Sequence, residues 1–243
     1  MLGGTSQINT RNMSQKERQD AVNEIRILSS IKHPYIVCLR YAFQSDEKLY
    51  LITDYYSGGS LFYHLRKARG FSENRARFYA AELLLALSHL HANHIIYRDL
   101  KLENVLMDHH GHIALTDFGL STMKEGRLTT RCGTPSYCAP ELLSGTGYGK
   151  AVDIWSLGVL LYEVIALELP FKASNIAALA RKVLGEAPSR LPFPRRGAGK
   201  VPTKTATSFF SSVRKTALDS DHAQTLYPGG LQNLVDFLLR KTP

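Results

Sequence analysis

Four polar side chains in one short stretch have the chemistry needed to move a phosphoryl group. They are Asp99, Lys101, Asn104 and Asp117. Such a transfer requires positioned charge more than covalent work by the protein. A carboxylate such as Asp99 could accept the proton of an acceptor hydroxyl, and Lys101 would place a positive charge near the moving group. The side-chain oxygens of Asn104 and Asp117 suit Mg²⁺, which is a hard cation.

Two short strands are predicted to bring the two metal ligands together. Residues 104–108 and 112–116 have the composition of strands, and a turn at 108–111 separates them. Because the strands of a hairpin lie side by side, we expect Asn104 and Asp117 at neighbouring strand ends.

The strings around these residues form an ordered series. Residues 97–104 are Y-R-D-L-K-L-E-N, and D-F-G follows at 117–119, A-P-E at 139–141 and D-I-W-S-L-G at 153–158. Any one of them could arise by chance, but their order and separations exclude chance as an explanation. The chain resembles the eukaryotic protein kinase family. Tyr97, with C-G-T-P at 132–135, resembles the basophilic serine/threonine kinases, the group that includes the cyclic-nucleotide-dependent kinases.

The resemblance implies an α+β fold with two lobes. Residues 1–57 would form part of a small β lobe, and residues 58–243 a mainly α-helical large lobe. ATP with Mg²⁺ would donate the phosphoryl group, and Ser or Thr hydroxyls of protein substrates would accept it. In that reaction Asp99 and Lys101 would be catalytic.

The same resemblance implies a nucleotide site and a set of regulatory residues. The residues implied at the nucleotide are Asp54, Tyr56, Glu103 and Leu106, in addition to the metal ligands Asn104 and Asp117. Backbone groups of Asp54 and Tyr56 would bind adenine. Glu103 could also meet a basic residue of the substrate, although Ser60 stands where many related kinases carry an acid.

The regulatory residues implied are Glu24, Arg98, Thr130 and Thr134. Glu24 matches the glutamate that pairs with an ATP-gripping lysine, and a solvent-facing glutamate is the alternative. Thr130, or its neighbour Thr129, falls at the position that an upstream kinase would phosphorylate. Arg98 would pair with that phosphate and order the segment. Thr134 matches the position that shapes a serine- or threonine-accepting site.

Two departures from the family pattern concern the ends of the chain. A glycine-rich loop and a lysine on the next strand are expected upstream, but Ser6 stands near the lysine position. Their loss would reduce transition-state stabilisation, since related charge contacts are worth factors of ~10³ or more. Residues 238–243 resemble the start of a closing motif, so we expect a chain truncated at both ends.

Three interpretations therefore stay open. The first is a serine/threonine kinase, which the intact Asp99, Asn104 and Asp117 favour. The second is a catalytically impaired pseudokinase or fragment that acts as a binding or scaffold module, which the missing lysine favours. The third is a docking protein that works through the basic residues of 187–228, a stretch that is predicted to be a flexible insertion.

Periodicity predicts the elements that must position these residues. Helices are expected at 15–31, at 61–69, after the capping residue Ser72, at 153–167 and around 231–239. A β-hairpin is expected from 35–43 and 48–55, and residues 1–10 are expected to be a short leader. The predicted core stripes are Val22, Ile25, Leu28 and Ile31 in the first helix, and Ala76, Tyr79, Leu83, Ala86, Leu87 and Leu90 in the long one.

Composition limits the remaining classes. A chain of 243 residues with 44% hydrophobic and 21% charged residues is ordinary for a globular domain. No apolar run reaches the length of a membrane span, and the longest contains Glu163 and Glu168. The net charge of +9 is spread over no single periodic face, so we expect no nucleic-acid partner. Three scattered cysteines and the lack of a signal pattern predict a cytoplasmic location, with the nucleus as the alternative.

Overall fold

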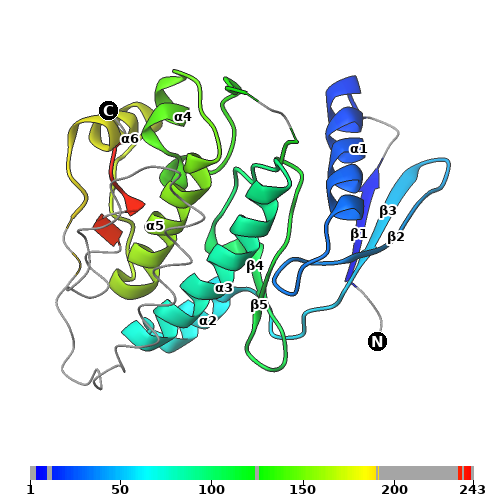
Figure 1. Ribbon diagram of the computed structural model, residues 1–243, viewed down its shortest axis with the longest axis horizontal. Coiled ribbons are helices and arrows are strands. Elements are labelled where there is room, and N and C mark those ends of the chain that lie inside the picture. The colour runs from blue at the N-terminus through cyan, green and yellow to red at the C-terminus, as the bar shows by residue number, and fades with distance from the viewer. Residues whose placement is uncertain are drawn as a thin grey trace.

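The computed structural model describes residues 4–9, 13–123, 126–189, 191, 235–236 and 238–241. A small sheet with one helix lies at one end and a group of helices at the other, with a short hairpin between them (Figure 1). The strands are β1 (Gly4–Asn9), β2 (Leu39–Gln44), β3 (Lys48–Thr53), β4 (Val105–Met107) and β5 (Ile113–Leu115). The α-helices are α1 (Gln15–Ser30), α2 (Leu61–Ala68), α3 (Glu73–Ala92), α4 (Pro140–Ser144), α5 (Ala151–Ala166) and α6 (Ile176–Gly185). This arrangement confirms the predicted α+β class.

The small sheet has the strand order β1-β3-β2, and both pairings are antiparallel. The prediction of a leader at residues 1–10 was wrong, because residues 4–9 form the edge strand β1, with Gly4 opposite Thr53. Its sequence shows little apolar alternation, so the strand owes its place to backbone pairing with β3. That pairing satisfies one edge of β3, which would otherwise present unpaired amides and carbonyls.

Helix α1 begins at a capping box, in which Ser14 Oγ accepts a hydrogen bond from the Glu17 amide and the Glu17 carboxylate accepts one from the Ser14 amide. The helix ends at Ser30, one residue before the predicted boundary. Ile27 and Leu28 are buried. Val22 was a wrong core prediction: it is 57% exposed, and its neighbour Ala21 faces the interior instead.

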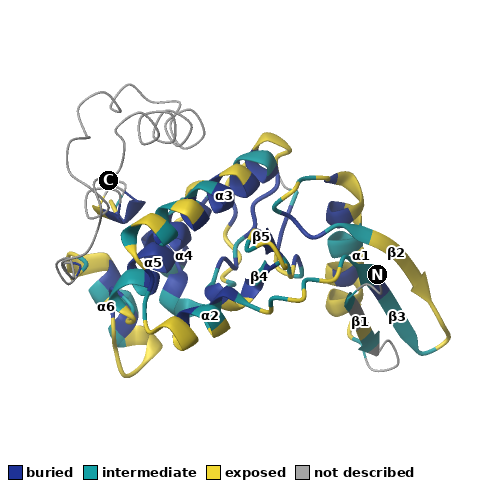
Figure 2. Cartoon of the chain, turned by 90° about the horizontal axis from the view of Figure 1, so that it is seen from below, coloured by how far each residue is buried: buried dark blue, intermediate teal, exposed yellow. Residues whose placement is uncertain are grey.

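Helices α3 and α5 pack against each other in the helical part, and Figure 2 shows buried residues along both helices. Ser72 caps α3 by accepting a hydrogen bond from the Arg75 amide, as predicted. Every residue of the predicted α3 stripe is buried. Helices α4 and α6 were not predicted; α4 has only five residues, too few for a periodic signal. In the described part of the chain, none of the helices is long and apolar enough to cross a membrane.

The segment near the C-terminus packs against α5. Val235, Leu238 and Leu239 are buried, and a Cβ atom at Gly158 would lie only 2.8 Å from Leu238 Cβ. The predicted C-terminal helix is seen at residues 235, 236 and 238, while Leu231 and Leu234 lie outside the described residues. The predicted insertion at 187–228 also lies outside them, except for residues 187–189 and 191.

Candidate active site

The hairpin of β4 and β5 places Asn104 and Asp117 at neighbouring strand ends. Val105 pairs with Leu115, and the amide of Thr116 donates to the carbonyl of Asn104 over 3.0 Å. The two candidate metal ligands therefore lie on adjoining chain segments, as the strand pattern predicts.

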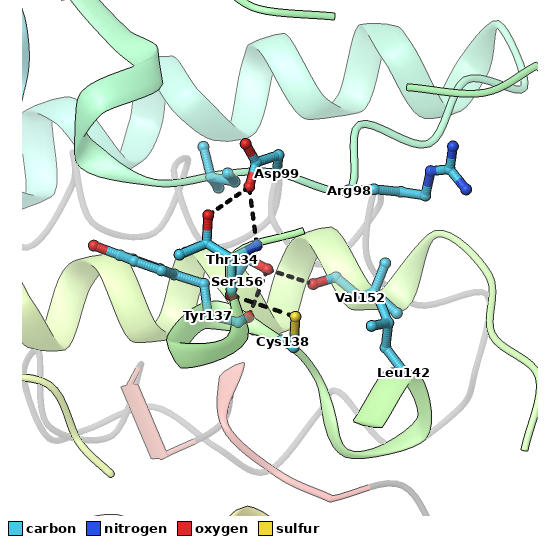
Figure 3. A pocket seen from close by; sticks show the side chains of 9 residues that line it. Arg98, Asp99, Thr134, Tyr137, Cys138, Leu142, Val152 and Ser156 are labelled. Carbon is cyan, nitrogen blue, oxygen red and sulfur yellow. Dashed lines mark hydrogen bonds between the residues drawn. The ribbon is translucent and has the colours of Figure 1, made fainter. Parts of the chain in front are cut away.

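Four donors surround the carboxylate of Asp99, whose residue is only 7% exposed. Oδ1 accepts from Thr134 Oγ1 at 2.8 Å and from the Thr134 amide at 3.1 Å, as Figure 3 shows. Oδ2 accepts from Lys101 Nζ at 2.6 Å and from Asn104 Nδ2 at 3.0 Å. This network fixes the carboxylate in a single orientation next to the only lysine of the motif. The sequence assigned Thr134 to the site but did not predict its contact with Asp99.

Asp117 lies in a tight turn with φ of 60°, a left-handed conformation that aspartate tolerates. Its side chain is exposed at the surface, and Oδ1 accepts from the Gly119 amide at 3.3 Å. Asn104 turns its amide nitrogen toward Asp99, so Oδ1 is the atom of this side chain that could serve as a metal ligand. Together the two residues offer the oxygen donors that Mg²⁺ prefers.

Glu24 of α1 faces the same turn. Its carboxylate accepts a hydrogen bond from the Phe118 amide, and Oε2 lies 3.8 Å from the position that a Cβ of Gly119 would take. Burial and the negative charge of Asp117 raise the pKa of Glu24. The solvent-facing alternative is therefore wrong, since α1 directs this carboxylate toward the D-F-G turn.

Asp153, at the start of α5, holds the backbone of Tyr97 and Arg98, the two residues before Asp99. Its carboxylate is fully buried and accepts from the amides of Tyr97 and Arg98 at 3.0 and 2.8 Å, and from His91 Nε2 at 2.7 Å. These bonds offset the cost of burying the charge. They also hold Arg98 at φ of 71°, one residue before Asp99.

The Arg98 side chain reaches the segment that carries Thr130. Nε donates to the Leu120 carbonyl at 2.6 Å, and Nη1 donates to the Tyr148 hydroxyl at 3.1 Å. That hydroxyl in turn donates to the carbonyl of Thr130 at 2.7 Å. The Tyr148 hydroxyl therefore links the Arg98 side chain to the backbone of the exposed Thr130. No sequence signal marked Tyr148.

The segment that follows β3 connects the two ends of the molecule. The Asp54 amide donates to the Cys38 carbonyl at 3.1 Å, and its carboxylate pairs with Arg40 at 2.6 Å. Burial raises the pKa of Tyr56 to about 12, so its hydroxyl stays neutral. Leu106 of β4 bridges to Ser60, which places it next to this connection.

Glu103 interacts electrostatically with the side chains of Tyr137 and Glu163. Its charge raises the pKa of both Tyr137 and Glu163, although burial is the larger cause at each. The Tyr137 hydroxyl donates to the Glu163 carboxylate. The sequence identified neither Tyr137 nor Glu163 as site residues, because their partners are distant along the chain.

Comparison with known proteins agrees with this geometry. The family model described as "Protein kinase domain" matches residues 5–238. A RAC family serine/threonine-protein kinase homolog from Dictyostelium discoideum is 50% identical over 184 residues, which cover 73% of this chain and 40% of that protein. A cAMP-dependent protein kinase catalytic subunit from the same organism is 49% identical over 179 residues, or 74% of this chain and 27% of that protein.

A RAC-beta serine/threonine-protein kinase from Rattus norvegicus is 45% identical over 188 residues, which cover 75% of this chain and 38% of that protein. The chain thus spans less than half the length of these relatives. Their names confirm the resemblance to the group that contains cyclic-nucleotide-dependent kinases. With a matching family model over nearly its whole length, the chain belongs to the protein kinase family.

Proposed function

We propose that this protein is a serine/threonine kinase that transfers the γ-phosphoryl group of ATP to Ser or Thr hydroxyls of proteins. The arrangement around Asp99 carries this proposal. A carboxylate held by Thr134, Lys101 and Asn104 is oriented to accept the proton of an acceptor hydroxyl. The ammonium group of Lys101 lies 2.6 Å from it and would stabilise negative charge on the phosphoryl group in transit.

Asn104 and Asp117 are the residues that would hold Mg²⁺. When bound, the ion would neutralise charge on the phosphates of ATP. Backbone groups of Asp54 and Tyr56 would bind the adenine, with Leu106 beside it. The boundary between the small lobe, 1–57, and the large lobe, 58–243, would then run through the nucleotide site.

A basic side chain before the acceptor residue would favour binding. Glu103 is exposed, and Glu163 is half-buried with its carboxylate bonded to Tyr137. Burial and the charge of Glu103 raise the pKa of Glu163, whereas the hydrogen bond from Tyr137 and the charge of Arg66 lower it. An arginine or lysine of the substrate would add a positive charge beside these two carboxylates. A peptide array in which Arg and Lys bring no enrichment would contradict this preference.

Phosphorylation of Thr130 by an upstream kinase would regulate the site. Thr130 is exposed, and the Tyr148 hydroxyl hydrogen-bonds both the Thr130 carbonyl and the Arg98 guanidinium. A phosphate there would give the guanidinium a charged partner next to Asp99.

The proposal is tested by Mg²⁺-dependent transfer of phosphate from ATP to a mixed Ser/Thr peptide library. Asp99→Asn and Asp117→Asn should abolish the transfer, whereas Asp46→Asn, at an exposed turn, should leave it intact. Transfer that survives both active-site changes would contradict the assigned roles. A wild-type chain that neither transfers phosphate nor binds ATP would overturn the proposed activity and favour the binding-module interpretation.

A further inference from the structure

We propose that the hydroxyl of Tyr148 is a positioning group that aligns Arg98 with the Thr130 segment. The inference rests on the proposed regulation of this kinase by a phosphate on Thr130. Tyr148 belongs to none of the sequence motifs, and its proposed role depends on its hydroxyl oxygen alone.

The ring of Tyr148 is held independently of its hydroxyl. The residue is only 2% exposed. Its backbone makes two hydrogen bonds with Leu128, of 3.0 and 2.9 Å, which form an antiparallel bridge. The segment at 126–131 therefore stays attached to the loop before α5 even when the hydroxyl is removed.

The hydroxyl itself has three polar partners, which are the Thr130 carbonyl, Arg98 Nη1 and, more distantly at 3.8 Å, the Cys132 thiol. It has a single proton, which it donates to the Thr130 carbonyl at 2.7 Å. Its lone pair accepts from Arg98 Nη1 at 3.1 Å. Burial raises the pKa of Tyr148, so the hydroxyl keeps the proton that this arrangement requires.

Arg98 depends on this hydroxyl for its direction. Its backbone is fixed by Asp153 and its Nε by the Leu120 carbonyl. Among the described residues, Tyr148 is the only side chain that hydrogen-bonds the guanidinium. The contact at Nη1 therefore sets the rotation of the group, and its remaining N–H bonds stay available for a phosphate on the same segment.

The test compares variants of the full chain that carry phosphothreonine at position 130, installed during synthesis. The rate at which a serine/threonine phosphatase removes the phosphate reports how well the guanidinium protects it. Arg98→Ala should raise that rate. Tyr148→Phe should raise it about tenfold, which is the lower end of what a hydrogen bond to a charged group is worth.

Tyr79→Phe is the matched control, because the Tyr79 hydroxyl also accepts from an arginine, Arg75 Nε at 3.2 Å, but belongs to α3. It should leave the rate unchanged. An unchanged rate in Tyr148→Phe would overturn the inference, as would an equal rise in Tyr79→Phe, which would indicate general loosening. No effect of Arg98→Ala would also overturn it, since Tyr148 would then have nothing to align. Because this readout needs no transfer from ATP, failure of the proposed activity would be recognised separately.

Discussion

The hydroxyl of Thr134 donates to Asp99 Oδ1 at 2.8 Å and accepts from Lys101 Nζ at 3.2 Å. One side chain from a segment 35 residues downstream thus contacts both the proposed base and the proposed cation. The two charged groups are held at a fixed separation by this hydroxyl as well as by their own ion pair.

Replacing Thr134 with valine should slow phosphoryl transfer. Valine keeps the shape and the backbone amide contact but loses the hydroxyl, so Asp99 and Lys101 lose a shared partner. We expect kcat to fall by about 10- to 100-fold, which is less than the roughly 10²- to 10⁴-fold contribution of general acid–base catalysis, because Asp99 itself remains. Thr134→Ser keeps the hydroxyl and should stay within a few-fold of wild type. Steady-state kinetics with a peptide substrate decide the matter, and equal losses in both variants would assign the effect to packing.

Removing Asp153 should destabilise the fold strongly. Asp153→Ala leaves two buried amides, of Tyr97 and Arg98, and the imidazole of His91 without their acceptor. We expect a loss of about 3–5 kcal/mol in the free energy of unfolding, as for other broken buried ionic networks. Urea denaturation measures it. Asp20→Ala, at an exposed position of α1, should change stability by no more than about 0.5 kcal/mol. Similar losses in the two variants would refute this account.

Glu24 should make the protein less stable at neutral pH than a neutral residue would. Burial and the charge of Asp117 raise its pKa in the folded state, so ionisation is harder in the fold than in the unfolded chain. The penalty is absent below the unfolded pKa of about 4.3, grows between the unfolded and the folded pKa, and is fully present above the folded pKa. Glu24→Gln should therefore melt at a higher temperature than wild type at pH 8, and the difference should shrink toward pH 4.

Glu17→Gln is the control for that comparison, because hydrogen bonds from Ser14 lower the pKa of Glu17. The ionised Glu17 therefore stabilises the fold. This stabilisation is present above the unfolded pKa and is lost as the pH falls through the folded pKa. Glu17→Gln should thus bring no gain at pH 8. A wild-type protein more stable than Glu24→Gln at pH 8 would indicate that Glu24 has a cationic partner.

The close approach of α5 to the C-terminal segment should make Gly158 intolerant of a side chain. A Cβ there would lie 2.8 Å from Leu238 Cβ and 2.9 Å from Leu239 Cδ2. Gly158→Ala should cost about 1–3 kcal/mol through overpacking. Gly185→Ala, at the last position of α6 with open space around it, should be neutral or slightly stabilising. If Gly158→Ala unfolds at the wild-type urea concentration, the segment at 238–239 does not pack on α5 in solution.

The sequence by itself determined which residues are candidates for the site and much of the secondary structure. Asp99, Lys101 and Asn104 lie within six residues of one another, and helical periods and the cap at Ser72 act over three or four residues. Such signals are local, so they can be found without knowing how the chain folds. The hairpin that brings Asn104 and Asp117 to neighbouring strand ends is short, so its signal is also local.

Only the tertiary structure decided which distant groups meet. Tyr148 reaches Arg98 across 50 residues, and Asp153 reaches the Arg98 amide across 55. The residues of β1 show little strand pattern, and β1 is a strand because its backbone pairs with the edge of β3. Contacts at such separations depend on the path of the whole chain. A buried donor bonds to whichever acceptor the fold brings near it, so the sequence around the donor does not indicate the partner.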